Sequence, residues 1–123
     1  MSSVLSKVKH FPAGQMRFEP YGGPPGKAGI ARLVGPGTSS SMGAGVATFD
    51  GCSIEWTVLY DELIVVLDGT FRLRIGGPDA RTIEAGPGDV IWLPENTPLR
   101  YEGDGARVFY ALSPVDWKAR HSL

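Results

Sequence analysis

Short apolar stretches separated by glycine and proline turns run along most of this sequence. The 123 residues include 17 glycines and 10 prolines, nearly twice the usual share. Apolar Phe71, Leu73 and Ile75 alternate with arginines, which is the pattern of a half-buried strand. Frequent turns and the lack of a sustained helical period predict an all-β fold of about eight to ten short strands, either a sandwich or a small barrel.

The length predicts one domain spanning residues 1–123. Within it we expect an N-terminal arm with loops over residues 1–41, the β core over residues 42–115 and a tail over residues 116–123. A glycine-rich turn at residues 103–105, between two apolar stretches, predicts a β-hairpin there.

Charge and composition exclude several classes of partner. A net charge of −1 and a pI near 6.1 provide no basic surface for nucleic acid, so no such partner is expected. No apolar stretch approaches the ~20 residues that cross a bilayer, so we expect no membrane partner. Cys52 has no second cysteine to pair with, and no signal peptide is evident, so we expect a cytoplasmic protein.

A glutamate, Glu62, lies within the apolar stretch WTVLYDELIVVLDG at residues 56–69. A carboxylate buried in such a strand needs partners. We interpret Glu62 as a catalytic acid or base, or as a group that binds a substrate hydroxyl or amine, with Tyr60 as its catalytic partner. The alternative is a structural carboxylate that bonds to Tyr60, Arg72 or backbone N–H groups.

Two stretches, residues 63–67 and 89–93, are apolar on both faces of the strand that each predicts. In an antiparallel sheet one such face meets the core, and the other is covered by more chain or by a partner subunit. A homodimer is therefore expected.

The layout around Glu62 resembles the two-part motif of the cupin superfamily. Glu62 and Gly69 match the first part, and GDVIWLP at residues 88–94 matches the second. Between about Ala44 and Trp117 the sequence is similar, more narrowly, to the EutQ family of ethanolamine-utilisation proteins. That resemblance is carried by Trp56-Thr57, Tyr60-Asp61-Glu62, Val66-Leu67, Gly69, Gly88-Asp89-Val90, Pro94, Tyr110, Pro114 and Trp117. It implies a cupin-type double-stranded β-helix, a jelly-roll barrel, preceded by an N-terminal arm.

The cupin motifs usually supply three histidines that hold a metal. In this sequence the first two positions fall on Trp56 and Val58, or on Glu55 and Thr57, depending on the spacing, and the third falls on Leu99. Because zinc, iron and manganese prefer imidazole or thiolate ligands, no tightly bound metal is expected and no metal ligand is assigned.

The two spacings also place different residues beside Glu62. The favoured one puts Trp56, Val58 and Tyr60 on the same strand face as Glu62. The other would leave Glu55 facing Glu62, where two carboxylates could hold Mg²⁺ weakly.

Other candidate ligand-binding residues follow from the barrel. Trp56, Trp92 and Tyr110 are candidates for the wall of an apolar pocket. Arg100 and Tyr101 lie where a cupin barrel opens, and Arg100 could hold a carboxylate or phosphate with two hydrogen bonds. Core packing for the aromatic residues and a solvated position for Arg100 are the alternatives.

The resemblance implies an acetate kinase-like activity on ATP and acetate, although the sequence contains no phosphate-binding loop of the Walker type. Three hypotheses therefore stand. The chain acts on a small carboxylate or amine metabolite; it binds such a small molecule without catalysis; or it is a structural, dimerising protein.

Overall fold

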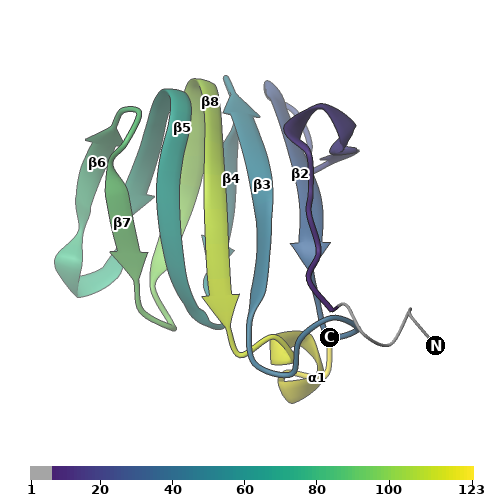
Figure 1. Cartoon of the computed structure of the whole chain (residues 1–123). Helices are drawn as coiled ribbons and strands as arrows, with labels where there is room; N and C mark the ends of the chain where they lie inside the picture. The colour runs from purple at the N-terminus through teal and green to yellow at the C-terminus, as the bar shows by residue number, and fades with distance from the viewer. Residues whose placement is uncertain (1–6) are drawn as a thin grey trace.

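The computed structural model describes residues 7–123, which form an antiparallel β-structure (Figure 1). The all-β class predicted from the sequence is confirmed, with eight strands in this part of the chain. The strands are β1 (Glu19–Pro20), β2 (Lys27–Val34), β3 (Gly43–Asp50), β4 (Ser53–Thr57), β5 (Asp61–Ile75), β6 (Arg81–Ala85), β7 (Val90–Leu93) and β8 (Pro98–Ser113). The helical elements are η2 (Ala13–Gln15), η3 (Gly77–Asp79) and α1 (Trp117–Arg120). None of these helices has the length and apolar character of a membrane span.

The two long strands, β5 and β8, organise the sheet. They pair along their whole length, from Asp61 opposite Ser113 to Ile75 opposite Leu99. On their other edges each changes neighbour halfway: β5 pairs with β7 and then β6, and β8 pairs with β4 and then β3. The sheet therefore folds into two layers that share β5 and β8, with β4 behind β3 and β8 in the view of Figure 1.

A bend, not a hairpin, lies at residues 103–105. β8 runs without interruption from Pro98 to Ser113, so the hairpin prediction is wrong. The register between β5 and β8 shifts near Gly69, whose backbone has a positive φ of 71°. A side chain at Gly69 would overlap the backbone of Gly105. The glycines therefore allow β5 and β8 to bend together. A glycine-rich sequence looks the same whether the strand bends there or reverses its direction in a turn.

The sheet includes two strands near the N-terminus. β1 and β2 lie within residues 1–41, and β2 pairs with β3 over seven residue pairs. Residues 7–18 run along the outside of this region (Figure 1). The Arg107 guanidinium lies 5.3 Å from the centre of the Phe18 ring and holds this segment against β8.

Aromatic and branched apolar side chains fill the space between the layers. Phe49, Phe71 and Tyr101 form a stack, with ring centres 5.4 to 6.3 Å apart. Within the described residues, Glu62 is the one buried charged side chain.

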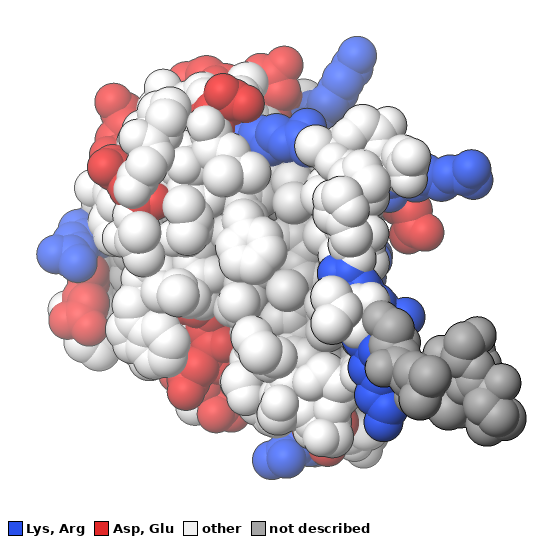
Figure 2. Space-filling model, viewed as in Figure 1, with Lys and Arg blue, Asp and Glu red and all other residues white. Residues whose placement is uncertain are grey.

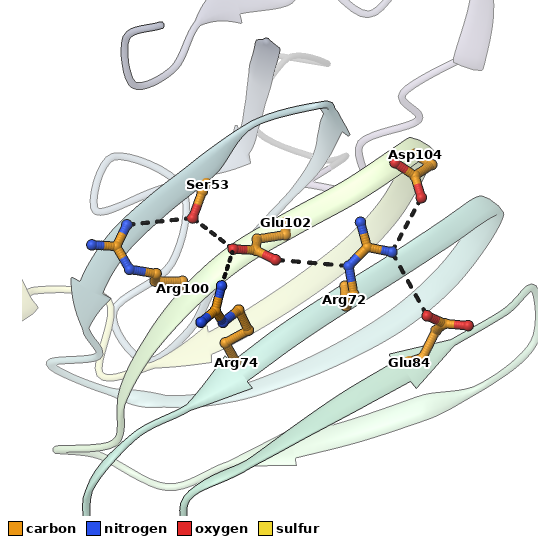
Figure 3. A network of polar contacts seen from close by, with 7 residues as sticks. All are labelled: Ser53, Arg72, Arg74, Glu84, Arg100, Glu102 and Asp104. Atoms are coloured by element: carbon orange, nitrogen blue, oxygen red, sulfur yellow. Dashed lines mark hydrogen bonds and ion pairs between the residues drawn. The ribbon is translucent and has the colours of Figure 1, made fainter. Parts of the chain in front are cut away.

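A polar network covers the outer face of the layer formed by β4, β5, β6 and β8 (Figure 3). At its centre is Glu102, whose side chain is 13% exposed. It accepts a 2.6 Å hydrogen bond from the Ser53 hydroxyl and lies within 3.7 Å of Arg72 and Arg74. Because these contacts join three strands, we interpret the network as structural.

Candidate functional site

A cavity of about 690 Å³ lies between the two layers. Its wall comes from β2, β3, β4, β5 and β8, and the segment containing α1 covers one end. Eight aromatic side chains line it: Tyr21, Phe49, Trp56, Tyr60, Phe71, Tyr101, Tyr110 and Trp117. A mainly apolar cavity with a few polar groups is the usual form of a small-molecule site.

Glu62 is the polar group at the centre of this cavity. Alternation along β5 turns it inward, where it is 5% exposed. The Tyr101 hydroxyl donates a 2.9 Å hydrogen bond to its Oε1 atom. Its Oε2 atom has no hydrogen-bond partner among residues 7–123 and is not enclosed by protein, so it is open to the cavity. Glu62 thus presents one fixed oxygen and one oxygen available to a ligand.

Burial controls the protonation of Glu62. It raises the pKa of this carboxyl from 4.5 to about 7, and the hydrogen bond from Tyr101 opposes part of that rise. No cationic side chain of the described chain lies close enough to lower this pKa. Both protonation states are therefore populated near neutral pH, as an acid or base requires.

Tyr60 lies beside Glu62 and is held by two tryptophans. Its hydroxyl accepts a 3.3 Å hydrogen bond from Nε1 of Trp56. The Trp117 ring packs 5.0 Å from the Tyr60 ring and edge-on against Trp56 at 6.0 Å. Burial raises the pKa of Tyr60 well above its usual range, so this phenol stays neutral and can donate a proton in a hydrogen bond.

The small residues of β3 make room for the remaining aromatic wall. Tyr110 lines the cavity, and a Cβ atom at Gly45 would lie only 2.6 Å from its hydroxyl oxygen. A Cβ at Gly43 would similarly lie 3.0 Å from Leu112. Gly45 and Gly43 therefore leave room for Tyr110 and Leu112, two side chains that line the cavity.

The structure favours the three-residue spacing of the first motif. Val58, Tyr60 and Glu62 are buried, and Trp56 is half-buried, although β4 ends at Thr57 before β5 begins. The Glu55 carboxylate is 80% exposed and lies 3.8 Å from Arg100. The two carboxylates of the alternative spacing are thus not brought together, and residues 7–123 contain no group of three or more His, Cys, Asp or Glu that could hold a metal ion.

Two residues assigned to ligand binding lie away from the cavity. Trp92 is 58% exposed, because alternation along β7 points Ile91 and Leu93 inward instead. Arg100 precedes the inward-pointing Tyr101, so its side chain lies on the outer face, where it donates a 3.3 Å hydrogen bond to Ser53 (Figure 3).

Three residues to which the sequence analysis gave no site role also line the cavity: Tyr21, Arg32 and Trp117. Arg32 comes from β2, and its charge acts to lower the pKa values of Tyr21 and Tyr110 against the larger effect of burial. Of these three residues, Tyr21 alone lies in a cluster of glycines and prolines, at residues 21–29, which is the local pattern of a loop.

Comparison with known proteins is consistent with this architecture. Residues 7–119 match the family described as ethanolamine utilisation protein EutQ. Over 122 residues the chain is 30% identical to acetate kinase EutQ of Salmonella typhimurium strain LT2, which covers 96% of this chain and 52% of that protein. Acetate kinase EutQ of Clostridioides difficile strain 630 is 31% identical over 68% of this chain and 52% of its own length. The chain therefore spans about half the length of these curated relatives.

Solved structures show the same fold. A crystal structure of ethanolamine utilization protein Q from Salmonella typhimurium LT2 has a TM-score of 0.79 and 29% identity, covering 89% of this chain and 88% of that chain. The polyketide cyclase RemF of Streptomyces resistomycificus has a TM-score of 0.72 at 20% identity, covering 86% and 79% of the two chains, which shows the fold alone. The predicted cupin-type jelly roll is confirmed, with hydrogen bonding that does not close the barrel.

Proposed function

Because the chain belongs to the family of ethanolamine utilisation protein EutQ, we propose that its cavity takes a small amine or carboxylate metabolite and that Glu62 is the acid or base there. One observation carries this proposal. A carboxyl group with a pKa of about 7 faces a cavity of about 690 Å³ with one oxygen free to meet a ligand. Structural carboxylates, in contrast, are usually satisfied on both oxygens.

The neighbours of Glu62 fit this role. Tyr101 fixes the orientation of the carboxyl group through Oε1, so that Oε2 is presented in one direction. Tyr60, neutral and packed against Trp117, offers a second hydrogen-bonding group to a ligand in the same cavity. In a non-catalytic binding module the same groups would position the ligand without proton transfer.

Acetate kinase-like phosphoryl transfer is the second candidate. It is favoured by the similarity to proteins named acetate kinase EutQ across 96% of this chain. Arg32 and Lys118 are the cationic side chains that line the cavity within the described residues, and they would be the groups to face phosphate oxygens. In this proposal Mg²⁺ would be held weakly, by ATP and few protein oxygens.

We also propose that a second copy of the chain covers the apolar outer face formed by Leu63, Leu67, Val90 and Trp92. These side chains are exposed, and Leu63 lies opposite Trp92 across β5 and β7. Figure 2 shows this side of the molecule as largely uncharged, with acidic and basic groups mainly toward its edges. A face with few charges can pair with its own copy around a two-fold axis with little like-charge repulsion.

The test of the Glu62 proposal compares Glu62→Gln with Glu55→Gln. Glu55 is a matched control because it contributes an exposed carboxylate to the rim of the same cavity. Thermal-shift binding and turnover are measured with ethanolamine, with acetate, and with acetate plus ATP. We expect Glu62→Gln to fold normally and to lose about 100-fold or more in turnover, the usual size of acid–base catalysis, while Glu55→Gln retains it. Unchanged activity in Glu62→Gln would remove this residue from the reaction.

A further inference from the structure

We propose that Glu62 is the counterion for the ammonium group of a ligand, so that the cavity selects amines over carboxylates. This inference rests on the function proposed above and names the ligand class for the same site. It follows from the charge balance of the cavity, from the chemistry of its walls and from the protonation that each ligand class would require.

Glu62 makes no ion pair within the described residues, although Arg32 and Lys118 also line the cavity. Its hydrogen-bond partner in the described chain is the neutral phenol of Tyr101. Arg32, which lines the cavity from β2, lies 3.6 Å from Glu19 of β1, and the shift in the pKa of Glu62 comes from burial and from Tyr101. A buried carboxylate without a cation is costly, and a ligand ammonium would supply the missing charge.

The walls around Glu62 also favour a cation. The rings of Tyr21, Tyr60, Tyr110 and Trp56 line the same cavity. Aromatic faces carry negative electrostatic potential and attract ammonium groups, while they repel carboxylates. The electron-rich walls and the carboxyl group thus select the same sign of charge.

Among the groups around the cavity whose pKa is shifted, Glu62 is the one that changes charge near neutral pH. Burial raises the pKa of every tyrosine that faces it, which keeps these phenols neutral: Tyr21 before β2, Tyr60 before β5, and Tyr101 and Tyr110 on β8. The charged side chains that line the rest of the cavity are Arg32 on β2, Glu55 on β4, and Asp116 and Lys118 at α1.

Binding of an amine therefore changes the protonation of Glu62 in a defined direction. Below pH 7 the free site is mainly the carboxylic acid. When an alkylammonium ion binds, the O–H bond of the carboxyl group breaks, its proton passes to the buffer, and the carboxylate pairs with the ammonium. A bound carboxylate ligand would instead share a proton with Glu62: below pH 7 this is the proton that Glu62 already holds, and above pH 7 it is drawn from the buffer. The two ligand classes thus have opposite proton linkage.

Isothermal titration calorimetry in two buffers with different heats of ionisation measures this linkage directly. The probes are ethanolamine, ethylene glycol and glycolate, together with benzylamine, benzyl alcohol and benzoate, each set being matched in size. We expect the amines to bind best, to release close to one proton each at pH 6, and to bind about tenfold more tightly at pH 8 than at pH 6, because the fraction of ionised Glu62 rises about tenfold.

The same two variants provide the control. Glu62→Gln removes the preference for amines and the dependence on pH, and Glu55→Gln keeps both. Tighter binding of glycolate or benzoate than of the amines, with proton uptake at pH 8, would overturn the amine inference and leave Glu62 as the acid or base. Absence of binding by both amines would also overturn it. Failure of the proposed function has a different signature: Glu62→Gln would leave turnover and binding unchanged.

Discussion

The hydroxyl of Tyr101 donates a 2.9 Å hydrogen bond to Oε1 of Glu62, which joins the two long strands across the cavity. The Tyr101 ring is itself fixed by stacking on Phe49, at 5.5 Å between ring centres. Because the bond stabilises the ionised carboxylate, Tyr101 lowers the pKa that burial has raised. This contact therefore orients Glu62 and offsets part of the rise in pKa that burial causes.

Replacing Tyr101 with phenylalanine tests this contact. The stacked ring remains in Tyr101→Phe, so the fold is retained, but the pKa of Glu62 rises above about 7 because the ionised form loses its donor. The pH profile of ligand binding then moves by about one pH unit or more toward alkaline pH, since a hydrogen bond to a charged group is worth ~1.5–3 kcal/mol. Tyr110→Phe, in the same cavity, is the control. A profile that Tyr101→Phe does not move would contradict this role.

Glu62 should make the stability of the fold depend on pH. Its pKa is about 7 in the folded chain and 4.5 as an ordinary glutamate, so between these values the folded state binds more protons than the unfolded state. The free energy of unfolding therefore falls as pH rises from 4.5, by up to about 3 kcal/mol above pH 7. Urea unfolding at pH 5 and pH 8 measures this loss, which Glu62→Gln should largely remove. If the free energy of unfolding fell equally between pH 5 and pH 8 in the unaltered chain and in Glu62→Gln, that result would count against a buried, titrating Glu62.

The polar network on the outer face predicts a different effect at Glu102. In Glu102→Gln, the Ser53 hydroxyl and Arg74 lose a charged partner that is 13% exposed. We expect the free energy of unfolding to fall by about 1 to 2 kcal/mol, with ligand binding unchanged. Glu84→Gln is the matched control, because that carboxylate is 69% exposed and makes one 3.7 Å ion pair. Equal stability of the two variants would show that the network contributes little.

The apolar outer face predicts that Trp92→Glu separates two copies of the chain. A charge at this exposed position would be buried without a partner in a dimer, whereas in a single chain it would remain in water. Sedimentation equilibrium should show a dimer for the unaltered chain and a monomer for the variant, with ligand binding retained. A wild-type chain that is monomeric, or a variant that stays dimeric, would refute this interface.

Much of the site could be predicted from local pattern. The strand around Phe71 and the inward side of Glu62 follow from alternation, and the favoured spacing puts Trp56, Tyr60 and Glu62 on one face. The structure places these three residues, together with Tyr101, around one cavity. These residues lie close together in the sequence, or on strands in which alternating apolar and polar residues show which side chains point inward.

The errors arose in two situations: where a strand is apolar on both faces, so alternation does not show which side points inward, and where a contact joins strands that are far apart in the sequence. Residues 89–93 are apolar on both faces, so alternation could not tell that Trp92 points outward. Glycines at residues 103–105 suit either a turn or a bend, and the pairing of β8 with β5 decides between them. Arg32 reaches the cavity only because β2 pairs onto β3, which no local signal encodes.

The most direct test of the account is the titration of the Glu62 carboxyl itself. Carbon-13 NMR of the chain labelled at glutamate side chains, with the Glu62 signal assigned by its loss in Glu62→Gln, follows this group from pH 3 to pH 10. The account predicts a midpoint near pH 7, because the carboxyl is buried with the Tyr101 hydroxyl as its single hydrogen-bond partner in the described chain. A midpoint near 4.5, the ordinary value, would contradict it.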